Sequence, residues 1–169
     1  MTIAYLSIGS NLGEKYDNCT RAKKMVDGLD HTRVLAVSSF YRTEPVDFLD
    51  QAWFVNGALR IETGLDPFTL MGHLKKIEGL MGQGKKDVRF GPRIVDLDIV
   101  LYGGEVINTD ALVIPHPRMH KRCFVLKPLC DIASGVVHPT LGKNMEQLLQ
   151  QIENDPGQEV EVYTKGDAG

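Results

Sequence analysis

The segment from Ile94 to Tyr102 constrains the fold of this chain more than any other. Apart from two aspartates, its residues are β-branched, aliphatic or aromatic, and this composition favours a β-strand. Successive side chains of a strand point to opposite faces. We therefore expect one face to carry Asp96, Asp98, Val100 and Tyr102, and the other to carry Val95, Leu97, Ile99 and Leu101. The two carboxylates would share a face, with their Cα atoms about 6–7 Å apart.

Two carboxylates at this separation suggest a cation site. Without a cation between them they repel each other, which raises the pKa of one of them. Their oxygens suit Mg²⁺, and Arg93, just before the segment, carries a charge that suits phosphate. The segment therefore predicts Mg²⁺–nucleotide chemistry, while the simpler interpretation is a solvated outer face with two ordinary aspartates.

The rest of the chain predicts a strand, helix, strand, strand, helix, strand order. The expected strands are 3–8, 32–42, 53–62 and 94–102, and the expected helices are 14–29 and 66–81. The second helix has the clearest start, because Asp66 suits an N-cap and Pro67 the first turn. This order is typical of an α+β fold with a ferredoxin-like βαββαβ core, in which helices pack on a mostly antiparallel sheet. A C-terminal hairpin near Val106 and Val113, short helices near 118–128 and 144–153, and a loose tail after Pro156 complete the prediction.

Length and composition indicate one globular domain. The chain has 169 residues, of which 43 % are hydrophobic and 24 % charged. We expect a single domain over 1–160 and a flexible tail over 161–169. The net charge of −3 argues against a general nucleic-acid binder or a membrane-surface protein, although the segments 82–93 and 116–127 are locally basic. Three cysteines without metal-site spacing, and no signal-peptide pattern, predict a cytoplasmic protein.

Several motifs together resemble one family. Arg-Phe-Gly-Pro-Arg-Ile-Val-Asp-Leu-Asp-Ile at 89–99 resembles the signature of the 6-hydroxymethyl-7,8-dihydropterin pyrophosphokinases. Further resemblances, in the family's order, lie at 4–13 (including Gly-Ser-Asn-Leu-Gly), 38–45, 54–58 and 114–119. The resemblance covers roughly residues 2 to 135. Several motifs in order are more specific than any one of them.

The resemblance implies a folate-biosynthesis enzyme. Members of the family transfer pyrophosphate from ATP to 6-hydroxymethyl-7,8-dihydropterin, which gives the pterin diphosphate and AMP. ATP would be the co-substrate, and two Mg²⁺ ions would be held by Asp96 and Asp98. The expected partners are these small molecules, with no nucleic acid and no membrane, and we expect a monomer.

The resemblance also assigns site residues. For pterin binding it implies Thr43, Pro45, Val46, Phe54, Asn56, Asp96 and Phe124. For ATP binding it implies Glu78, Phe90, Arg93, Ile99, His116 and Arg122. The expected catalytic residues are Arg93, Asp96, Asp98 and Lys85.

Physical chemistry supports several of these roles, although each has a simpler alternative. Two phenylalanine rings can stack on a pterin ring, but Phe54 and Phe124 also suit a core. The amide of Asn56 matches the mixed donor and acceptor edge of a pterin, but an asparagine also suits the end of a strand. His116 is an isolated histidine, and such a residue is more often structural or on the surface than a ligand. For Glu78 the default role is that of a residue on a helix surface.

Three departures from the family pattern affect the expected chemistry. Gln83 stands where the family commonly has an arginine that assists transfer, so we expect Lys85 or Lys86 to supply that charge. Phe90 replaces a residue that is often tryptophan, and Ala111 replaces a basic residue of some members. Two alternatives stay open: a pterin- or nucleotide-binding homologue with weakened catalysis, which Gln83 suggests, and, from another class, a ferredoxin-like nucleic-acid-binding domain. The second lacks its aromatic-rich strand motif here.

Overall fold

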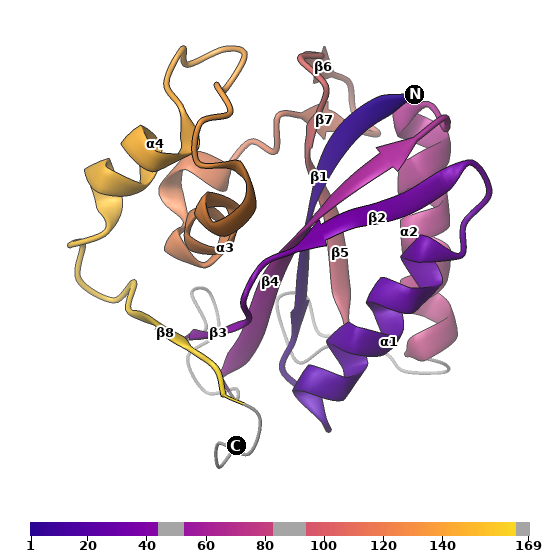
Figure 1. The fold of residues 1–169 in the computed structure, drawn as a ribbon, viewed down its shortest axis with the longest axis horizontal. Coiled ribbons are helices and arrows are strands. Elements are labelled where there is room, and N and C mark those ends of the chain that lie inside the picture. Colours follow the sequence, from indigo (N-terminus) through magenta and orange to yellow (C-terminus); the bar gives the residue numbers. More distant parts are fainter. Residues whose placement is uncertain (44–52, 83–93, 165–169) are drawn as a thin grey trace.

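The computed structural model describes residues 1–43, 53–82 and 94–164; the remaining residues lie outside the described part (Figure 1). The strands of the main sheet are β1 (Thr2–Ser10), β2 (Thr32–Val37), β3 (Tyr41–Thr43), β4 (Phe54–Thr63), β5 (Asp96–Tyr102) and β8 (Val160–Val162). The helices are α1 (Lys15–Asp27), α2 (Pro67–Met81), a short 3₁₀ helix η1 (Met119–Lys121), α3 (Cys123–Ala133) and α4 (Met145–Ile152). A separate hairpin is formed by β6 (Ile107–Asn108) and β7 (Val113–Ile114).

The main sheet has the predicted ferredoxin-like topology. Its order is β5-β1-β4-β3-β8, and β2 also pairs with β4, beyond the end of β3. Every pairing in the sheet is antiparallel. The α+β fold class is therefore confirmed, and so is the C-terminal hairpin near Val106 and Val113.

Helices cover both faces of the sheet (Figure 1). On one face, α1 and α2 enclose a core with the sheet residues Leu6, Ile8, Leu59, Leu97 and Ile99. On the other face, α3 and α4 enclose a second core with Tyr5, Ala58, Val100 and Leu101. The part of this second face that lies away from α4 holds the polar residues described below.

The start of α2 follows the sequence prediction. Asp66 is the N-cap, its carboxylate accepts a hydrogen bond from the Thr69 N–H at 2.9 Å, and Pro67 opens the helix. The predicted helix end near Pro128 was wrong, because α3 continues to Ala133 with this proline inside it. Leu129 and Ala133, beyond the proline, are buried in the second core, and their packing compensates for the missing backbone donor.

The predicted strand 32–42 is two strands. Strand β2 ends at Val37, and β3 begins at Tyr41. Between them the hydroxyl of Ser38 accepts from the Ala58 N–H at 2.8 Å and donates to the Ser39 carbonyl at 2.7 Å. A serine side chain that bonds to the backbone in this way competes with a regular strand ladder.

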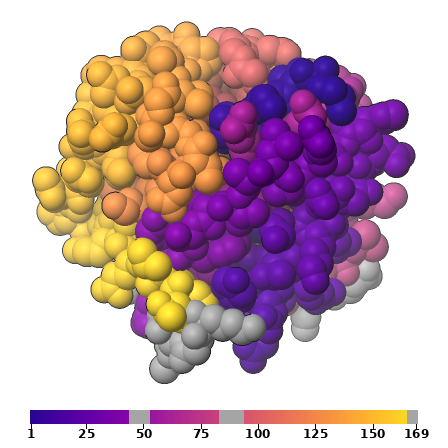
Figure 2. Space-filling view, viewed as in Figure 1, coloured from indigo at the N-terminus to yellow at the C-terminus, as the bar shows by residue number. Residues whose placement is uncertain are grey.

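The predicted loose tail after Pro156 was also wrong over Val160–Val162. These residues form β8, which pairs with β3. The next residue, Tyr163, donates its N–H to the Phe40 carbonyl at 2.8 Å, and its ring stacks on Tyr16 with centroids 5.8 Å apart. In Figure 2 the C-terminal segment, in yellow, lies against purple atoms from the first third of the chain.

A bulge in β5 changes the predicted alternation of faces. Tyr5 pairs with Leu101 and Leu6 pairs with Ile99, so Val100 has no partner on β1. An extra residue in one strand reverses the faces of all residues beyond it. Leu101 therefore lies in the second core and Tyr102 in the first, opposite to the prediction.

Among the described helices, none combines the length and the apolar character that crossing a membrane requires.

Candidate active site

Three neighbouring strands place Asn56 and Asp96 in one row on the face that carries α3. Gly9 of β1 pairs with Asn56 of β4 on one side and with Asp96 of β5 on the other. Residues paired across an antiparallel sheet point to the same face. Because adjacent strands lie about 4.8 Å apart, the backbones of Asn56 and Asp96 are about 10 Å apart, with only a glycine between them.

The glycine is required where it stands. A Cβ atom at Gly9 would collide with Oδ1 of Asn56. The Asn56 side chain is fixed at its other end, because its Nδ2 donates to Oγ1 of Thr43 at 2.6 Å, and both residues are buried. Two residues that the sequence assigned to pterin binding are thus in direct contact.

The second aspartate, Asp98, lies one row further along the same face. It pairs with Ser7 of β1, and its side chain is 42 % exposed. Nζ of Lys75, from α2, lies 3.6 Å from its Oδ1. The same ammonium group lies 3.2 Å from Oε2 of Glu78 and 3.3 Å from the Leu97 carbonyl oxygen. The sequence reasoning did not identify Lys75.

Glu78 and Lys75 together border the outer edge of β5. The Glu78 carboxylate accepts the Leu97 N–H at 2.7 Å, and Lys75 donates to the Leu97 carbonyl. Burial raises the pKa of Glu78, although Lys75 and the Leu97 N–H act in the opposite direction. Burial alone would lower the pKa of Lys75, but the nearby carboxylates of Asp98, Glu78 and Asp96 outweigh it and raise that pKa.

His116 reaches this edge because of the bulge in β5. Its backbone N–H donates to the carbonyl of Val100, the bulged residue, at 3.0 Å. Its Nδ1 accepts the Arg118 N–H at 3.2 Å, so the neutral ring carries its proton on Nε2. Burial lowers the pKa of His116; Asp98 opposes this effect, and Arg122 adds to it. The neutral imidazole therefore presents Nε2–H as a hydrogen-bond donor.

Two aromatic residues assigned to pterin binding flank this face. Phe54 begins β4 in register with Thr43, shares the face of Asn56, and is half-buried. Phe124 lies in the first turn of α3, also half-buried, with the guanidinium of Arg122 over its ring at 5.4 Å from the centroid.

The side chain of Ile99 does not lie with the aspartates. It is buried in the core under α1 and α2. Alternation along the strand turns its N–H and C=O to the outer edge of β5, as it does those of Leu97 two residues earlier. Only its backbone can contact a ligand at this edge. Five other predicted site residues lie outside the described residues: Pro45, Val46, Lys85, Phe90 and Arg93.

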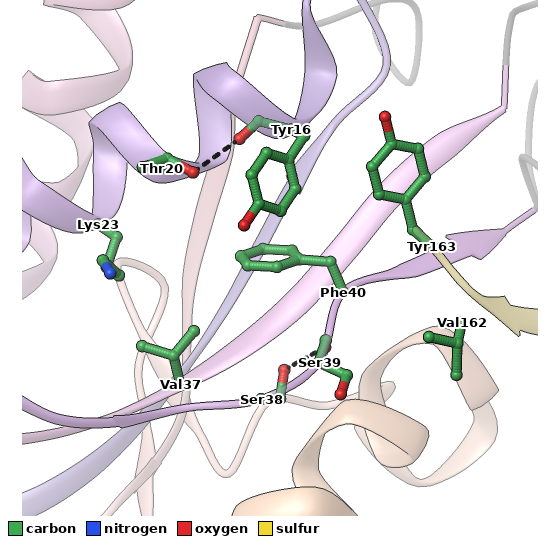
Figure 3. A pocket seen from close by; sticks show the side chains of 9 residues that line it. All are labelled: Tyr16, Thr20, Lys23, Val37, Ser38, Ser39, Phe40, Val162 and Tyr163. Carbon is green, nitrogen blue, oxygen red and sulfur yellow. Dashed lines mark hydrogen bonds between the residues drawn. The ribbon is translucent and has the colours of Figure 1, made fainter. Parts of the chain in front are cut away.

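A separate cavity of about 330 Å³ lies beside α1 and β8 (Figure 3). Its walls include the rings of Tyr16, Phe40 and Tyr163, and among the described lining residues one is charged, Lys23. Within 1–43, 53–82 and 94–164, the cavity shares no residue with the predicted site.

The residues that face the α3 side of β5 fit a magnesium ion. Asp96 and Asp98 are half-exposed carboxylates, and Mg²⁺ is usually held by one or two carboxylates together with substrate phosphates and water. Within the part of the chain that the structure describes, no group of three histidine, cysteine, aspartate or glutamate residues forms a metal cage.

Fold and site together define a ferredoxin-like α+β domain with a mixed acidic and basic site at its edge strand. Residues 5–134 match the family described as 7,8-dihydro-6-hydroxymethylpterin-pyrophosphokinase (HPPK). The chain belongs to this family.

Relatives of two lengths are similar to the chain. The 2-amino-4-hydroxy-6-hydroxymethyldihydropteridine pyrophosphokinase of Bacillus subtilis is 43 % identical over 134 residues, which is 79 % of this chain and 80 % of that protein. The folic acid synthesis protein fol1 of Schizosaccharomyces pombe is 39 % identical over 165 residues, 98 % of this chain, but the chain spans only 22 % of its length. The solved structure of wild-type Plasmodium falciparum HPPK-DHPS with pteroate is 15 % identical, with a TM-score of 0.68 over 89 % of this chain and 42 % of that one. The last comparison supports the fold.

Proposed function

We propose that this chain transfers the β,γ-pyrophosphoryl group of ATP to the hydroxymethyl oxygen of 6-hydroxymethyl-7,8-dihydropterin and releases AMP, as a step of folate biosynthesis in the cytoplasm. The observation that carries the proposal is the row Asn56–Gly9–Asp96. An amide suited to the pterin edge and a carboxylate suited to a metal share a face, about 10 Å apart at the backbone. This span suits a two-ring heterocycle whose one-carbon arm points at the carboxylates.

The pterin is held on the α3 side of the sheet. Thr43 orients the amide of Asn56, which forms hydrogen bonds with the edge of the ring. Phe54 and Phe124 contact the two faces of the ring. Pro45 and Val46 belong to the same proposed pocket and lie outside the described residues. Gly9 leaves room for Oδ1 of Asn56, with which a Cβ at that position would collide.

The nucleotide lies along the edge of β5. His116 donates from Nε2 and Arg122 from its guanidinium to phosphate oxygens, while the backbone of Ile99 and the side chain of Glu78 border the site. Arg93, Lys85 and Phe90, outside the described residues, complete the proposed contacts, and Lys85 compensates for the neutral Gln83.

Asp96 and Asp98 would hold two Mg²⁺ ions, which supply charge stabilisation of the transferring group and lower the pKa of the acceptor alcohol. The chain's own contribution is positioning: the sheet fixes both reactants, and the cationic side chains stabilise the charge that develops on the phosphates. We expect the protein to act as a monomer.

An assay with ATP, Mg²⁺ and the dihydropterin tests the proposal. AMP that forms only when the pterin is present supports pyrophosphoryl transfer. Formation of ADP would instead indicate a different kinase, and tight binding without turnover would indicate a homologue with weakened catalysis.

A further inference from the structure

Lys75 occupies the position beside Asp98 where a cation is expected. Its ammonium group contacts three oxygen atoms: Oδ1 of Asp98 at 3.6 Å, Oε2 of Glu78 at 3.2 Å and the Leu97 carbonyl oxygen at 3.3 Å. Oxygen atoms of this kind are also the preferred ligands of a hard divalent cation. A metal that binds Asp98 therefore meets a positive charge already in contact with that carboxylate.

We propose that Lys75 is a resident counter-ion of Asp98 that makes divalent-cation binding depend on the nucleotide. In the enzyme without nucleotide, the ammonium group competes with the metal for the carboxylate. Phosphate oxygens of a bound nucleotide add ligands for the metal and offer the ammonium group another acceptor. This inference rests on the proposed function, because it concerns the same metal site.

The geometry allows Lys75 to leave Asp98 without disturbing the fold. Its side chain is 50 % exposed and flexible, and it reaches β5 from the surface of α2. Glu78 is more fixed, since it is only 17 % exposed and accepts the Leu97 N–H at 2.7 Å. When the ammonium group moves, the hydrogen bond between Glu78 and Leu97 remains and keeps α2 attached to the edge strand.

Binding of Mn²⁺, used as a substitute for Mg²⁺ and measured by electron paramagnetic resonance, tests the inference. Without nucleotide, Lys75→Met should bind Mn²⁺ about fivefold more tightly than the wild type, as expected for removal of one partly exposed charge. Lys75→Arg keeps the charge and should resemble the wild type. Lys76→Met is the matched control, because Lys76 is the exposed neighbour on the same helix, and its Mn²⁺ affinity should be unchanged.

The second arm of the experiment adds a saturating non-hydrolysable ATP analogue. The difference in Mn²⁺ affinity between wild type and Lys75→Met should then fall to within about twofold, because the phosphates supply most of the metal ligands. A difference that stays the same with and without the analogue would contradict the dependence on nucleotide.

A double variant separates Lys75 from Glu78. If Lys75→Met acted only by releasing Glu78 as a new metal ligand, Lys75→Met combined with Glu78→Gln would lose the tighter binding, and the counter-ion role would be wrong. Equal or weaker Mn²⁺ binding by Lys75→Met would also overturn the inference. If instead the wild type binds no Mn²⁺ even with the analogue, or Asp98→Asn binds it as well as the wild type, the proposed metal site itself is wrong.

Discussion

At one edge of the sheet, strand β5 is bordered by side chains of α2. At the other edge, the short strand β8 pairs with β3 through its backbone. The carboxylate and ammonium groups beside Leu97 satisfy its backbone and still contact Asp98. Val160–Val162 satisfy β3 with backbone groups alone. An edge bordered by charged side chains can exchange its partners with a ligand, while an edge bordered by another strand stabilises the fold and holds Thr43 in place.

The largest effect should follow from changing the aspartates of the β5 edge. Asp96→Asn and Asp98→Asn should each lower turnover by about 10²–10³-fold or more, because each removes a charge from the metal site. Stability should change by less than about 1 kcal/mol, since both carboxylates are half-exposed. Turnover and thermal unfolding measure the two effects. Glu161→Gln, on the exposed side of β8, is the matched control and should keep wild-type turnover. If Asp96→Asn or Asp98→Asn kept near-normal turnover at saturating Mg²⁺, the functional contrast between the two edges would be wrong.

The next effect should come from the centre of the sheet, between the two edges. Asn56→Ala should weaken pterin binding by about 1–3 kcal/mol, because it removes a buried amide that reads the ring edge, and it should leave ATP binding nearly unchanged. Separate titrations of the two ligands measure this. Phe124→Leu should show the same selectivity with a smaller loss. Equal losses for both ligands would mean that Asn56 supports the fold in general.

The β8 edge should respond in stability and not in chemistry. Tyr163→Leu removes the stacking on Tyr16 and the ring contact with Trp53, so the free energy of unfolding should fall by about 1–2 kcal/mol. Denaturant unfolding provides the measurement. Val162→Thr, at a side chain that is 60 % exposed, should change stability by less than about 0.5 kcal/mol. If Tyr163→Leu lowers the turnover number at saturating substrates by as much as Asp98→Asn, the β8 edge affects catalysis as strongly as the β5 edge, and the contrast between them is wrong.

The smallest effect concerns pH, on the side of α4. Burial, and to a lesser extent His120, lower the pKa of His138 from its ordinary value of 6.5. The unfolded chain then binds a proton more readily than the folded chain, so stability falls as the pH drops below about 6.5. His138→Asn keeps an acceptor for the Thr140 and Leu141 N–H groups but does not titrate. It should reduce the loss of stability between pH 7 and pH 5 by a fraction of a kcal/mol. An unchanged pH dependence would show that other groups cause the loss.

What the sequence could predict depended on the range of the interactions. The start of α2 follows from Asp66 and Pro67 alone, because an N-cap bonds within three residues, and this prediction was confirmed. Strand β8 depends on pairing with β3, more than a hundred residues earlier, and a polar tail gives no local sign of it. The contact between Lys75 and Asp98 is equally non-local. The i,i+3 spacing of Lys75 and Glu78 indicates their mutual ion pair, but not that the pair borders β5.

The bulge at Val100 has a consequence for transplanting this motif. If the Asp-x-Asp strand were copied into another sheet without the bulge, the two aspartates would still share a face. The Val100 carbonyl would then no longer point toward the backbone N–H of His116. Tyr102 would also emerge on the wrong side and lose its hydroxyl bond to the Leu65 carbonyl. The extra residue reverses the alternation of faces partway along the strand. Before it, Asp96 and Asp98 face the site; after it, Tyr102 faces the core under α1 and α2. The unit that has to be moved as one piece runs from Asp96 through Val100 to His116.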